Sequence, residues 1–225
     1  VTAGYSLESS KESINLANRY NFIYATIGIS PNDIPDNING IKEEIDQLNE
    51  LYRTSEKIVA VGEIGLDYHW NTENKDLQRY AFIEQIKLAN KLELPIQIHT
   101  RDAVMDTIDI LKTNDVKCGG IFHCCPFNRE LVKEGLKLGF YISFAGPTTF
   151  KNSKNASEII NMVPDDRLLV ETDSSYLSPE PYRGKRNDPR KVQYILMKIA
   201  EVKGRTFDEV QNMAYENAKR IFRIK

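Results

Sequence analysis

The chain has 225 residues and a mass of 25.8 kDa, with 41% hydrophobic and 28% charged residues. This composition is typical of soluble globular proteins and excludes collagen, coiled coils and disordered chains, and the length favours one domain over residues 1–225. Lys and Arg number 30 against 32 Asp and Glu, a net charge of −2, so any contact with nucleic acid must come from a local basic patch.

The sequence indicates a reduced, cytoplasmic protein. No apolar run approaches the roughly 18 residues of a membrane span, and no secretory leader opens the chain. The three cysteines include the adjacent Cys124 and Cys125, a pattern that does not suit a disulfide framework. We therefore expect free thiols, a cytoplasmic location, no membrane contact and no obligate protein partner.

Strand and helix patterns alternate along the chain. The apolar, β-branched and aromatic residues at 22–29 predict a buried strand, and apolar residues three or four apart between Ile38 and Tyr52 predict an amphipathic helix. A first helix is expected at 7–20 and a last one at about 206–222, opened by a capping box of Thr206 and Glu209. Further strands are predicted at 58–62, 95–99, 120–123, 140–144 and 168–171. The helices between them are predicted to open near Asp76, Arg101, Asn128, Asn155 and Pro189.

The alternation predicts a parallel α/β fold. Six strands are clear, and residues 1–3 have the character of the end of a seventh. A closed (β/α)8 barrel has eight strands and typically about 250 residues. We therefore predict a (β/α)8 TIM-type barrel that lacks its first βα unit, the chain being N-terminally incomplete. A doubly wound open sheet is the alternative, but no Gly-rich fingerprint follows any predicted strand.

Polar residues lie at the ends of these strands. Glu63 follows the strand at 58–62, while His99 and His123 close their strands and Glu171 and Asp173 close the strand at 168–171. In a parallel barrel these strand ends share the face that carries the active site. Carboxylates and imidazoles are ligands for zinc or manganese, and a bound metal activates water and polarises phosphoryl or carbonyl oxygens. The pattern predicts a metal-dependent hydrolase.

Structural roles are the alternatives for these residues. Glu63 would be costly in its apolar strand unless it binds a metal or pairs with a buried arginine, and Asp173 would also serve as a helix cap or loop charge. His69 is expected either to touch substrate or to lie on the surface. Cys124 and Cys125 are interpreted as core thiols, since no second cysteine pair completes a zinc site. The absence of G-x-S-x-G, P-loop and H-E-x-x-H patterns disfavours serine esterases, NTPases and zincins.

Residues 182–191 form a basic stretch in this net-acidic chain. It contains five cations: Arg183, Lys185, Arg186, Arg190 and Lys191. Such a stretch before a helix start is able to bind substrate phosphates, and a solvated loop is the alternative. Arg101, two residues after His99, is placed similarly at a predicted helix start.

These residues resemble the TatD family of metal-dependent deoxyribonucleases, which are amidohydrolase-like barrels. Residues 61–68 (VGEIGLDY) resemble the family's glutamate motif, 95–103 (PIQIHTRDA) its histidine motif, and 170–177 (VETDSSYL) with the basic loop at 182–189 its aspartate motif. The resemblance implies that Glu63 bridges two divalent metals, that His99 and His123 ligate one of them, and that Asp173 ligates the other and acts as general base.

The resemblance further implies cleavage of DNA phosphodiester bonds in the manner of a 3′–5′ exonuclease, with zinc, manganese or magnesium as cofactor and DNA or another nucleic acid as partner. Expected substrate-binding residues are His69, Arg101, Tyr176, Arg183, Lys185 and Arg186. The family's first-strand His-x-His pair has no counterpart, residues 123–127 (HCCPF) replace the usual HCFSG, and residues 28–31 (GISP) replace GIHP. Alternatives are a hydrolase of small esters, amides, lactones or phosphoesters, and an inactive fragment or binding scaffold with an incomplete metal site.

Overall fold

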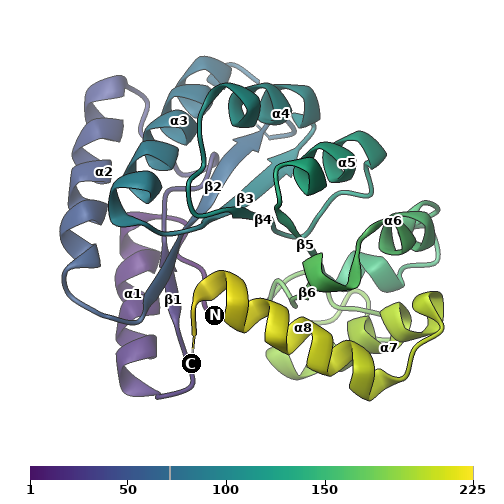
Figure 1. Ribbon diagram of the computed structural model, residues 1–225. Helices are drawn as coiled ribbons and strands as arrows, with labels where there is room; N and C mark the ends of the chain where they lie inside the picture. Colours follow the sequence, from purple (N-terminus) through teal and green to yellow (C-terminus); the bar gives the residue numbers. More distant parts are fainter. Residues whose placement is uncertain (71, 225) are drawn as a thin grey trace. The chain divides into compact units, whose positions relative to one another are not determined.

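The computed structural model describes residues 1–70 and 72–224. The chain divides into two compact units, one covering Val1–Gly120 and the other beginning at Ile121. Helices and strands alternate along the chain in both units, as the ribbon in Figure 1 shows. The α/β alternation predicted from the sequence is therefore confirmed.

The first unit is built on parallel strands. Its elements are α1 (Leu7–Arg19), β1 (Ala25–Ile27), α2 (Ile38–Tyr52), β2 (Ile58–Asp67), α3 (Lys75–Leu92), β3 (Ile96–Arg101) and α4 (Val104–Thr113). Strand β2 pairs in parallel with both β1 and β3, and the β2–β3 register places Gly65 opposite His99. Residues 1–3 contribute an isolated bridge between Thr2 and Ala25 rather than a longer strand.

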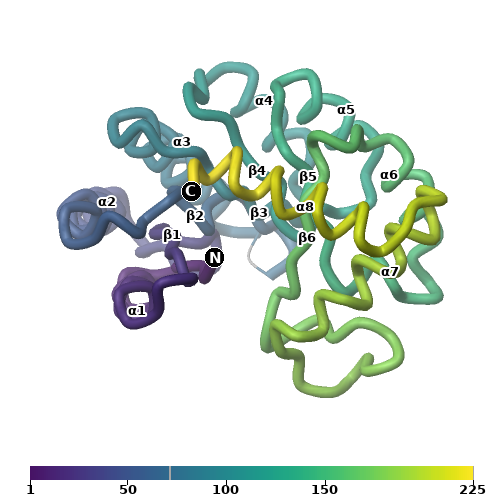
Figure 2. The backbone as a smooth tube through the Cα atoms, turned by 60° about the horizontal axis from the view of Figure 1, so that its bottom comes forward, coloured from purple at the N-terminus to yellow at the C-terminus, as the bar shows by residue number. Residues whose placement is uncertain are grey.

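The second unit continues the same pattern. Strand β4 (Gly120–Phe122) starts at the last residue of the first unit, and its Ile121 and Phe122 pair in parallel with β5 (Tyr141–Phe144), which pairs with β6 (Leu168–Val170). The other elements are α5 (Arg129–Lys137), η1 (Gly146–Thr149), α6 (Ala156–Met162), η2 (Asp165–Arg167), η3 (Pro189–Lys191), α7 (Val192–Lys203) and α8 (Phe207–Phe222), where η denotes a 3₁₀ helix. In Figure 2 the long connection between β6 and η3, drawn in light green, extends away from the strands.

Side-chain caps fix where helices begin. The Thr206 hydroxyl accepts from the backbone N–H of Glu209 at 3.2 Å, and the Glu209 carboxylate accepts from the N–H of Thr206 at 2.8 Å. This reciprocal pair is the capping box predicted from the sequence. Asn128 caps α5 by accepting from the N–H of Leu131 at 3.0 Å. Such caps satisfy N–H groups that have no partner within the helix.

Strand β2 lies at the centre of the first unit's core. Every residue of β2 is buried except Glu63, which is partly exposed, and Ile64 and Leu66 are fully buried. Helix α3 packs against β2 and contributes the fully buried side chains of Phe82 and Ile86. A strand buried on both faces is expected of a parallel sheet covered by crossover helices.

Two buried glutamines of α3 each hold the backbone of one residue at or shortly after the end of a strand. Gln78 accepts from the N–H of Asp67 at 2.9 Å and donates to its carbonyl at 3.0 Å. Gln85 makes the equivalent pair with Ile29, at 2.8 and 3.0 Å. Residues seven apart lie on the same face of a helix, about two turns apart. One helix face therefore fixes both the end of β2 and the segment that follows β1.

The strand limits differ from the predicted ones. Strand β1 is shorter than residues 22–29, and Phe22 before it is 80% exposed. Strand β2 continues through Glu63 to Asp67, and β3 continues to Arg101, because the two strands stay paired that far. The charged residue at position 63 predicts that the strand ends at residue 62, and the structure shows that the strand continues past it. For the same reason the helix predicted to open near Arg101 begins at Val104.

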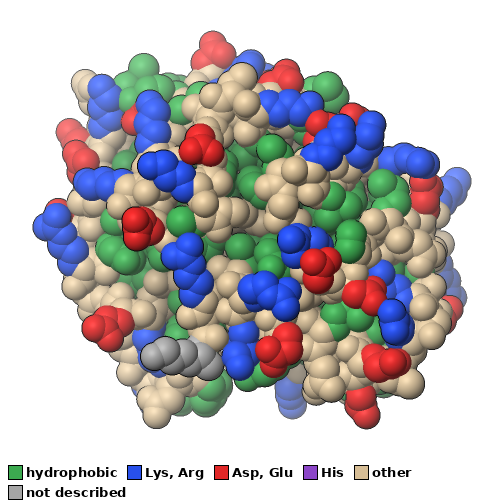
Figure 3. Space-filling model, in the orientation of Figure 1, with side chains coloured by type: hydrophobic (Ala, Val, Ile, Leu, Met, Phe, Trp, Pro, Cys, Tyr) green, Lys and Arg blue, Asp and Glu red, His purple; other side chains and the backbone are tan. Residues whose placement is uncertain are grey.

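The surface carries charges of both signs. On the face shown in Figure 3, Lys and Arg side chains are interspersed with Asp and Glu side chains, with hydrophobic side chains between them. This mixture agrees with the net charge of −2. Within residues 1–70 and 72–224, no helix has the length and apolar character needed to cross a membrane.

Candidate metal centre

Glu63 is a carboxylate placed within an otherwise buried strand. Its side chain is 18% exposed, and its Oε1 lies 3.0 Å from Nδ1 of His99. Burying a carboxylate without a partner is costly, so this contact explains how β2 tolerates Glu63. The contact is made by a histidine, and no arginine among residues 1–70 and 72–224 is buried, so the buried arginine considered as the alternative is not found there.

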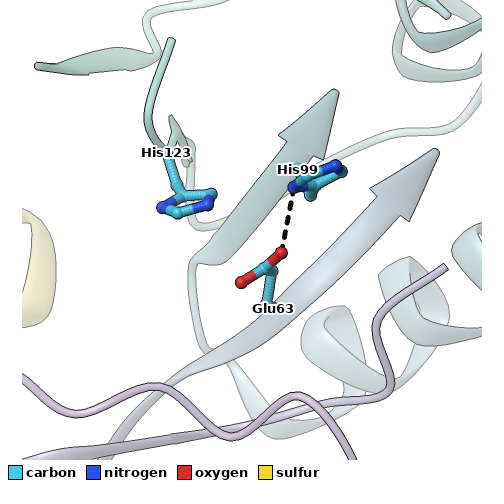
Figure 4. A group of neighbouring side chains, drawn as sticks. All are labelled: Glu63, His99 and His123. Carbon is cyan, nitrogen blue, oxygen red and sulfur yellow. Dashed lines mark ion pairs between the residues drawn. The ribbon is translucent and has the colours of Figure 1, made fainter. Parts of the chain in front are cut away.

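His99 lies between two carboxylates. Its Nδ1 faces Glu63, as Figure 4 shows, and its Nε2 lies 3.0 Å from Oδ2 of Asp67. The backbone of His99 is approached closely by Gly65, where a Cβ would stand 2.1 Å from the His99 carbonyl oxygen. Gly65 also has a φ of +136°, which side chains rarely adopt. Gly65 therefore allows β2 to pass directly beside the histidine.

Asp67 is a buried residue with many hydrogen bonds. Its Oδ2 accepts from His99 and from Asn32 at 3.2 Å, and its Oδ1 accepts from the N–H groups of His69 at 2.9 Å and Trp70 at 3.4 Å. Burial alone would raise the pKa of Asp67, but the hydrogen bonds from His99 and the His69 backbone outweigh it and hold the pKa well below its ordinary value. Asp67 is therefore ionised at neutral pH.

In the second unit, His123 pairs with Glu171. His123 is 7% exposed, and its Nδ1 lies 2.8 Å from Oε2 of Glu171. The other carboxylate oxygen accepts from the backbone N–H of Cys124, and the Ser143 hydroxyl also donates to Glu171. Burial raises the pKa of Glu171, but His123 and these donors outweigh it and lower the pKa. His99, within β3, and His123, directly after β4, thus each have an ionised carboxylate on a ring nitrogen.

Asp173 follows β6 in the second unit. It is partly exposed, has a φ of +55°, and its carbonyl accepts from the N–H of Tyr176 at 2.9 Å. The role of helix cap belongs to another residue, because the next helical segment, η3, is capped by Asp188. A metal-binding role for Asp173 stays a prediction.

Three of the predicted substrate residues lie shortly after β2, at the last residue of β3, and on the long connection between β6 and η3. His69 Nδ1 lies 3.0 Å from Oδ2 of Asp102, and both side chains are exposed. The guanidinium of Arg101 lies over the ring of Trp70, 5.3 Å from its centroid. Tyr176 is 77% exposed. Their substrate contacts stay predictions, and Trp70 is an exposed aromatic residue that the sequence reasoning did not single out.

The basic stretch divides into two groups. Arg190 and Lys191 face Asp188, at 2.8 and 3.5 Å, and so have a structural partner. Arg183, Lys185 and Arg186 are exposed. The Arg183 guanidinium donates to Asn152 Oδ1 at 3.1 Å and lies 4.2 Å from the Phe150 ring centroid. Arg190 is exposed as well, so pairing with Asp188, and not exposure, separates the two groups.

Two residues beside the histidines were not assigned a role from the sequence. Asp67 was part of the motif at 61–68, and Glu171 was noted as a strand end. The available signal was a carboxylate at the end of each apolar run, which must find a partner when it is buried. Cys125, interpreted as a core thiol, is 4% exposed, and burial raises the pKa of its thiol.

The arrangement around each histidine is one that suits a divalent metal. A metal-binding imidazole usually donates its second ring N–H to a carboxylate, which fixes the ring. His99 and His123 both have that carboxylate, and His99 also has the Glu63 carboxylate on its other nitrogen. Imidazole and carboxylate donors together favour zinc or manganese.

Comparisons with known proteins agree on one family. The family model for TatD related DNase matches residues 1–223. YabD of Bacillus subtilis, described as an uncharacterized metal-dependent hydrolase, is 45% identical over 225 residues, which cover 100% of this chain and 87% of YabD. YcfH of Escherichia coli K12 has the same description and is 42% identical over 182 residues, covering 80% of this chain and 68% of YcfH.

Solved structures show the same fold. The crystal structure of YjjV, a TatD homologue from Escherichia coli K12, matches with a TM-score of 0.92 and 24% identity, covering 99% of this chain and 85% of YjjV. At this identity the likeness concerns the fold. The predicted parallel α/β fold of the TatD type is therefore confirmed.

Proposed function

Because this chain belongs to the TatD family of metal-dependent hydrolases, we propose that it hydrolyses phosphodiester bonds of DNA, acting from the 3′ end with a metal-activated water. The observation that carries the proposal is the placement of His99 between Glu63 and Asp67, at 3.0 Å from each. A histidine that has a supporting carboxylate on one nitrogen and a second carboxylate on the other suits a metal ligand.

We assign the metal ligands as follows. As the family resemblance implies, Glu63 bridges two divalent metals, and His99 and His123 bind one of them. Asp173 binds a second metal, as the family resemblance implies. Carboxylate and imidazole ligands favour zinc or manganese, whereas magnesium prefers oxygen ligands and retains water.

The protein residues have separate roles in the proposed reaction. A divalent metal at these ligands lowers the pKa of water and polarises the phosphoryl oxygen. Asp173 takes the proton of the attacking water, as a general base does. The exposed cations Arg183, Lys185 and Arg186 bind phosphates that flank the scissile bond. His69, Arg101 and Tyr176 contact the nucleotide next to that bond.

The proposal is tested by following DNA cleavage after the protein is stripped of metal and reloaded with zinc, manganese or magnesium. The substrate is a single-stranded oligonucleotide labelled at its 5′ end, so that attack from the 3′ end gives a ladder of shortening products. Glu63→Gln and His99→Ala are expected to abolish the metal-dependent ladder. The matched control is Glu50→Gln, because Glu50 pairs with Arg53 at the surface and its side chain is 65% exposed.

Each outcome separates the candidate functions. A ladder from the 3′ end that requires metal, Glu63 and His99 supports the proposal. Cleavage by either variant at the rate of the unmodified protein contradicts the assignment of the site. Hydrolysis of small esters, amides or phosphoesters without DNA cleavage assigns the metal centre to another substrate class. No metal-dependent hydrolysis of any of these substrates leaves the chain a binding scaffold or inactive fragment.

A further inference from the structure

An exposed tryptophan lies at the carboxyl end of the first unit's strands. Trp70 comes three residues after the end of β2 and is 70% exposed. The guanidinium of Arg101, the last residue of β3, lies over its ring at 5.3 Å from the centroid. We propose that Trp70 binds an unpaired base of single-stranded DNA by stacking. This inference rests on the proposed function, in which DNA is the substrate, and it names a residue that binds the base.

The turn after β2 is fixed by its own hydrogen bonds. Oδ1 of Asp67 accepts from the backbone N–H groups of His69 at 2.9 Å and Trp70 at 3.4 Å. The N–H of Tyr68 donates to the carbonyl of Arg101 at 2.9 Å. An aspartate that accepts from the backbone two residues further on stabilises a turn. This turn brings Trp70 back beside the end of β3.

Two neighbours hold the indole ring in one orientation. Arg101 lies over the ring, and the imidazole of His69 meets it nearly at right angles, with an interplanar angle of 87° and ring centroids 4.8 Å apart. His69 is itself held by Asp102, whose Oδ2 lies 3.0 Å from Nδ1 of the imidazole. The ring is therefore ordered before a ligand arrives, which lowers the entropic cost of binding. Because Trp70 is largely exposed, ring surface stays open to a planar ligand.

The neighbours of Trp70 place it close to the candidate ligands of the first unit. His99 and Arg101 are two residues apart in β3, so their side chains project from the same face of the strand, roughly 7 Å apart along it. His99 in turn contacts Glu63 at 3.0 Å. Trp70, which packs on Arg101, therefore lies where the base of a nucleotide next to the scissile bond is expected.

The chemistry of this pair suits an unpaired base. An indole offers a flat apolar surface on which any of the bases is able to stack, and the cation of Arg101 attracts the phosphate backbone. Inside a double helix the faces of the bases are covered by the neighbouring base pairs. A residue that stacks on a single base therefore favours single-stranded DNA, which is consistent with an enzyme that works from the end of a strand.

The fluorescence of the protein reports the proposed contact directly, because Trp70 is the only tryptophan of the chain. The whole chain is titrated with single-stranded oligothymidylate in the presence of a chelator, which prevents metal-dependent cleavage. A base stacked on the indole quenches its fluorescence, so we expect quenching that saturates. An abasic oligonucleotide of the same length carries the phosphates without the bases. It is expected to leave the fluorescence nearly unchanged.

Substitutions measure the size of the effect through the anisotropy of a fluorescein-labelled oligothymidylate. Trp70→Ala is expected to raise the dissociation constant about 5- to 150-fold, the usual cost of removing one stacking residue. Trp70→Phe is expected to keep most of the affinity, because a phenyl ring also stacks on a base. Circular dichroism shows whether each variant is folded, and an exposed side chain is expected to be replaceable without loss of the fold.

Phe22→Ala is the matched control, because Phe22 is an aromatic residue that is 80% exposed. It comes before β1, whereas Trp70 comes after β2, and these two strands pair in parallel. Phe22 therefore lies at the opposite end of the strands from Trp70. Phe22→Ala is expected to leave the dissociation constant of oligothymidylate unchanged.

The outcomes for Trp70 and for the proposed function are distinguishable. Equal dissociation constants for folded Trp70→Ala and the unmodified protein, or oligothymidylate that does not quench the tryptophan, would overturn the inference. A metal-dependent ladder from the 3′ end would still support the proposed function in that case. Conversely, quenching by oligothymidylate without DNA cleavage by the metal-loaded protein would support base binding by Trp70 and contradict the nuclease activity.

Discussion

The backbone anchor at the end of β2 predicts a specific loss of stability. Replacing Gln78 by methionine keeps a side chain of similar length but removes its amide. The N–H and carbonyl of Asp67, which Gln78 contacts at 2.9 and 3.0 Å, then lose these partners in a buried place. Each unsatisfied buried group costs about 1–3 kcal/mol. The free energy of unfolding should therefore fall by about 2–6 kcal/mol.

The matched variant is Gln85→Met, which removes the same two bonds from Ile29. Both variants should unfold at lower urea concentration, and the melting temperature should fall by about 2–4 °C for each kcal/mol lost. Only Gln78→Met should also weaken zinc binding, because Gln78 holds the backbone of Asp67, whose carboxylate contacts His99. Ordinary surface substitutions change the free energy of unfolding by less than about 0.5 kcal/mol. A loss this small in Gln78→Met would refute the reasoning, because it would mean that the N–H and carbonyl of Asp67 find other partners.

Three further predictions concern single residues. In urea unfolding, Gly65→Ala should lower the free energy of unfolding more than Gly139→Ala. Both glycines have positive φ, but a Cβ at position 65 would lie 2.1 Å from the His99 carbonyl oxygen, whereas a Cβ at position 139 would have no atom within 4 Å. Equal losses in the two variants would contradict this close approach. Burial raises the pKa of Asp67, but the hydrogen bond from His99 outweighs burial and keeps this pKa below the ordinary value of about 3.9. The ionised Asp67 therefore stabilises the fold fully above about pH 3.9, and this stabilisation is lost as the pH falls through the folded-state pKa. Asp67→Asn should therefore flatten the acid limb of stability measured against pH, and an unchanged slope would assign that limb to other groups. Burial and the Glu171 charge raise the pKa of the Cys125 thiol, so iodoacetamide at pH 8 should label it only after urea unfolding; labelling in the folded protein at the rate of a free thiol would show that it is accessible.

The sequence was sufficient for the type of fold, and it singled out Glu63, His99 and His123 as candidate ligands. Apolar runs that alternate with amphipathic segments predict a parallel α/β chain, because strands covered on both faces are apolar throughout. These three residues drew attention because a polar residue within an apolar strand, or directly after one, is uncommon without a function. Their chemistry predicts a metal ligand whatever the exact strand limits are.

The supporting residues were not predicted, for a physical reason. Asp67 and Glu171 contact His99 and His123, and these contacts join residues that are 32 and 48 positions apart along the chain. Strand β2 was predicted too short because Glu63 is unfavourable in a strand unless it has a partner, and that partner, His99, lies on the next strand. Local propensity does not contain such information.

The most direct test of the metal centre is an anomalous diffraction measurement at the zinc edge on crystals of the zinc-loaded protein. The account predicts an anomalous peak bonded to the Glu63 carboxylate and to one ring nitrogen each of His99 and His123. A map without a peak at these three side chains, or with zinc bound only elsewhere, would contradict it.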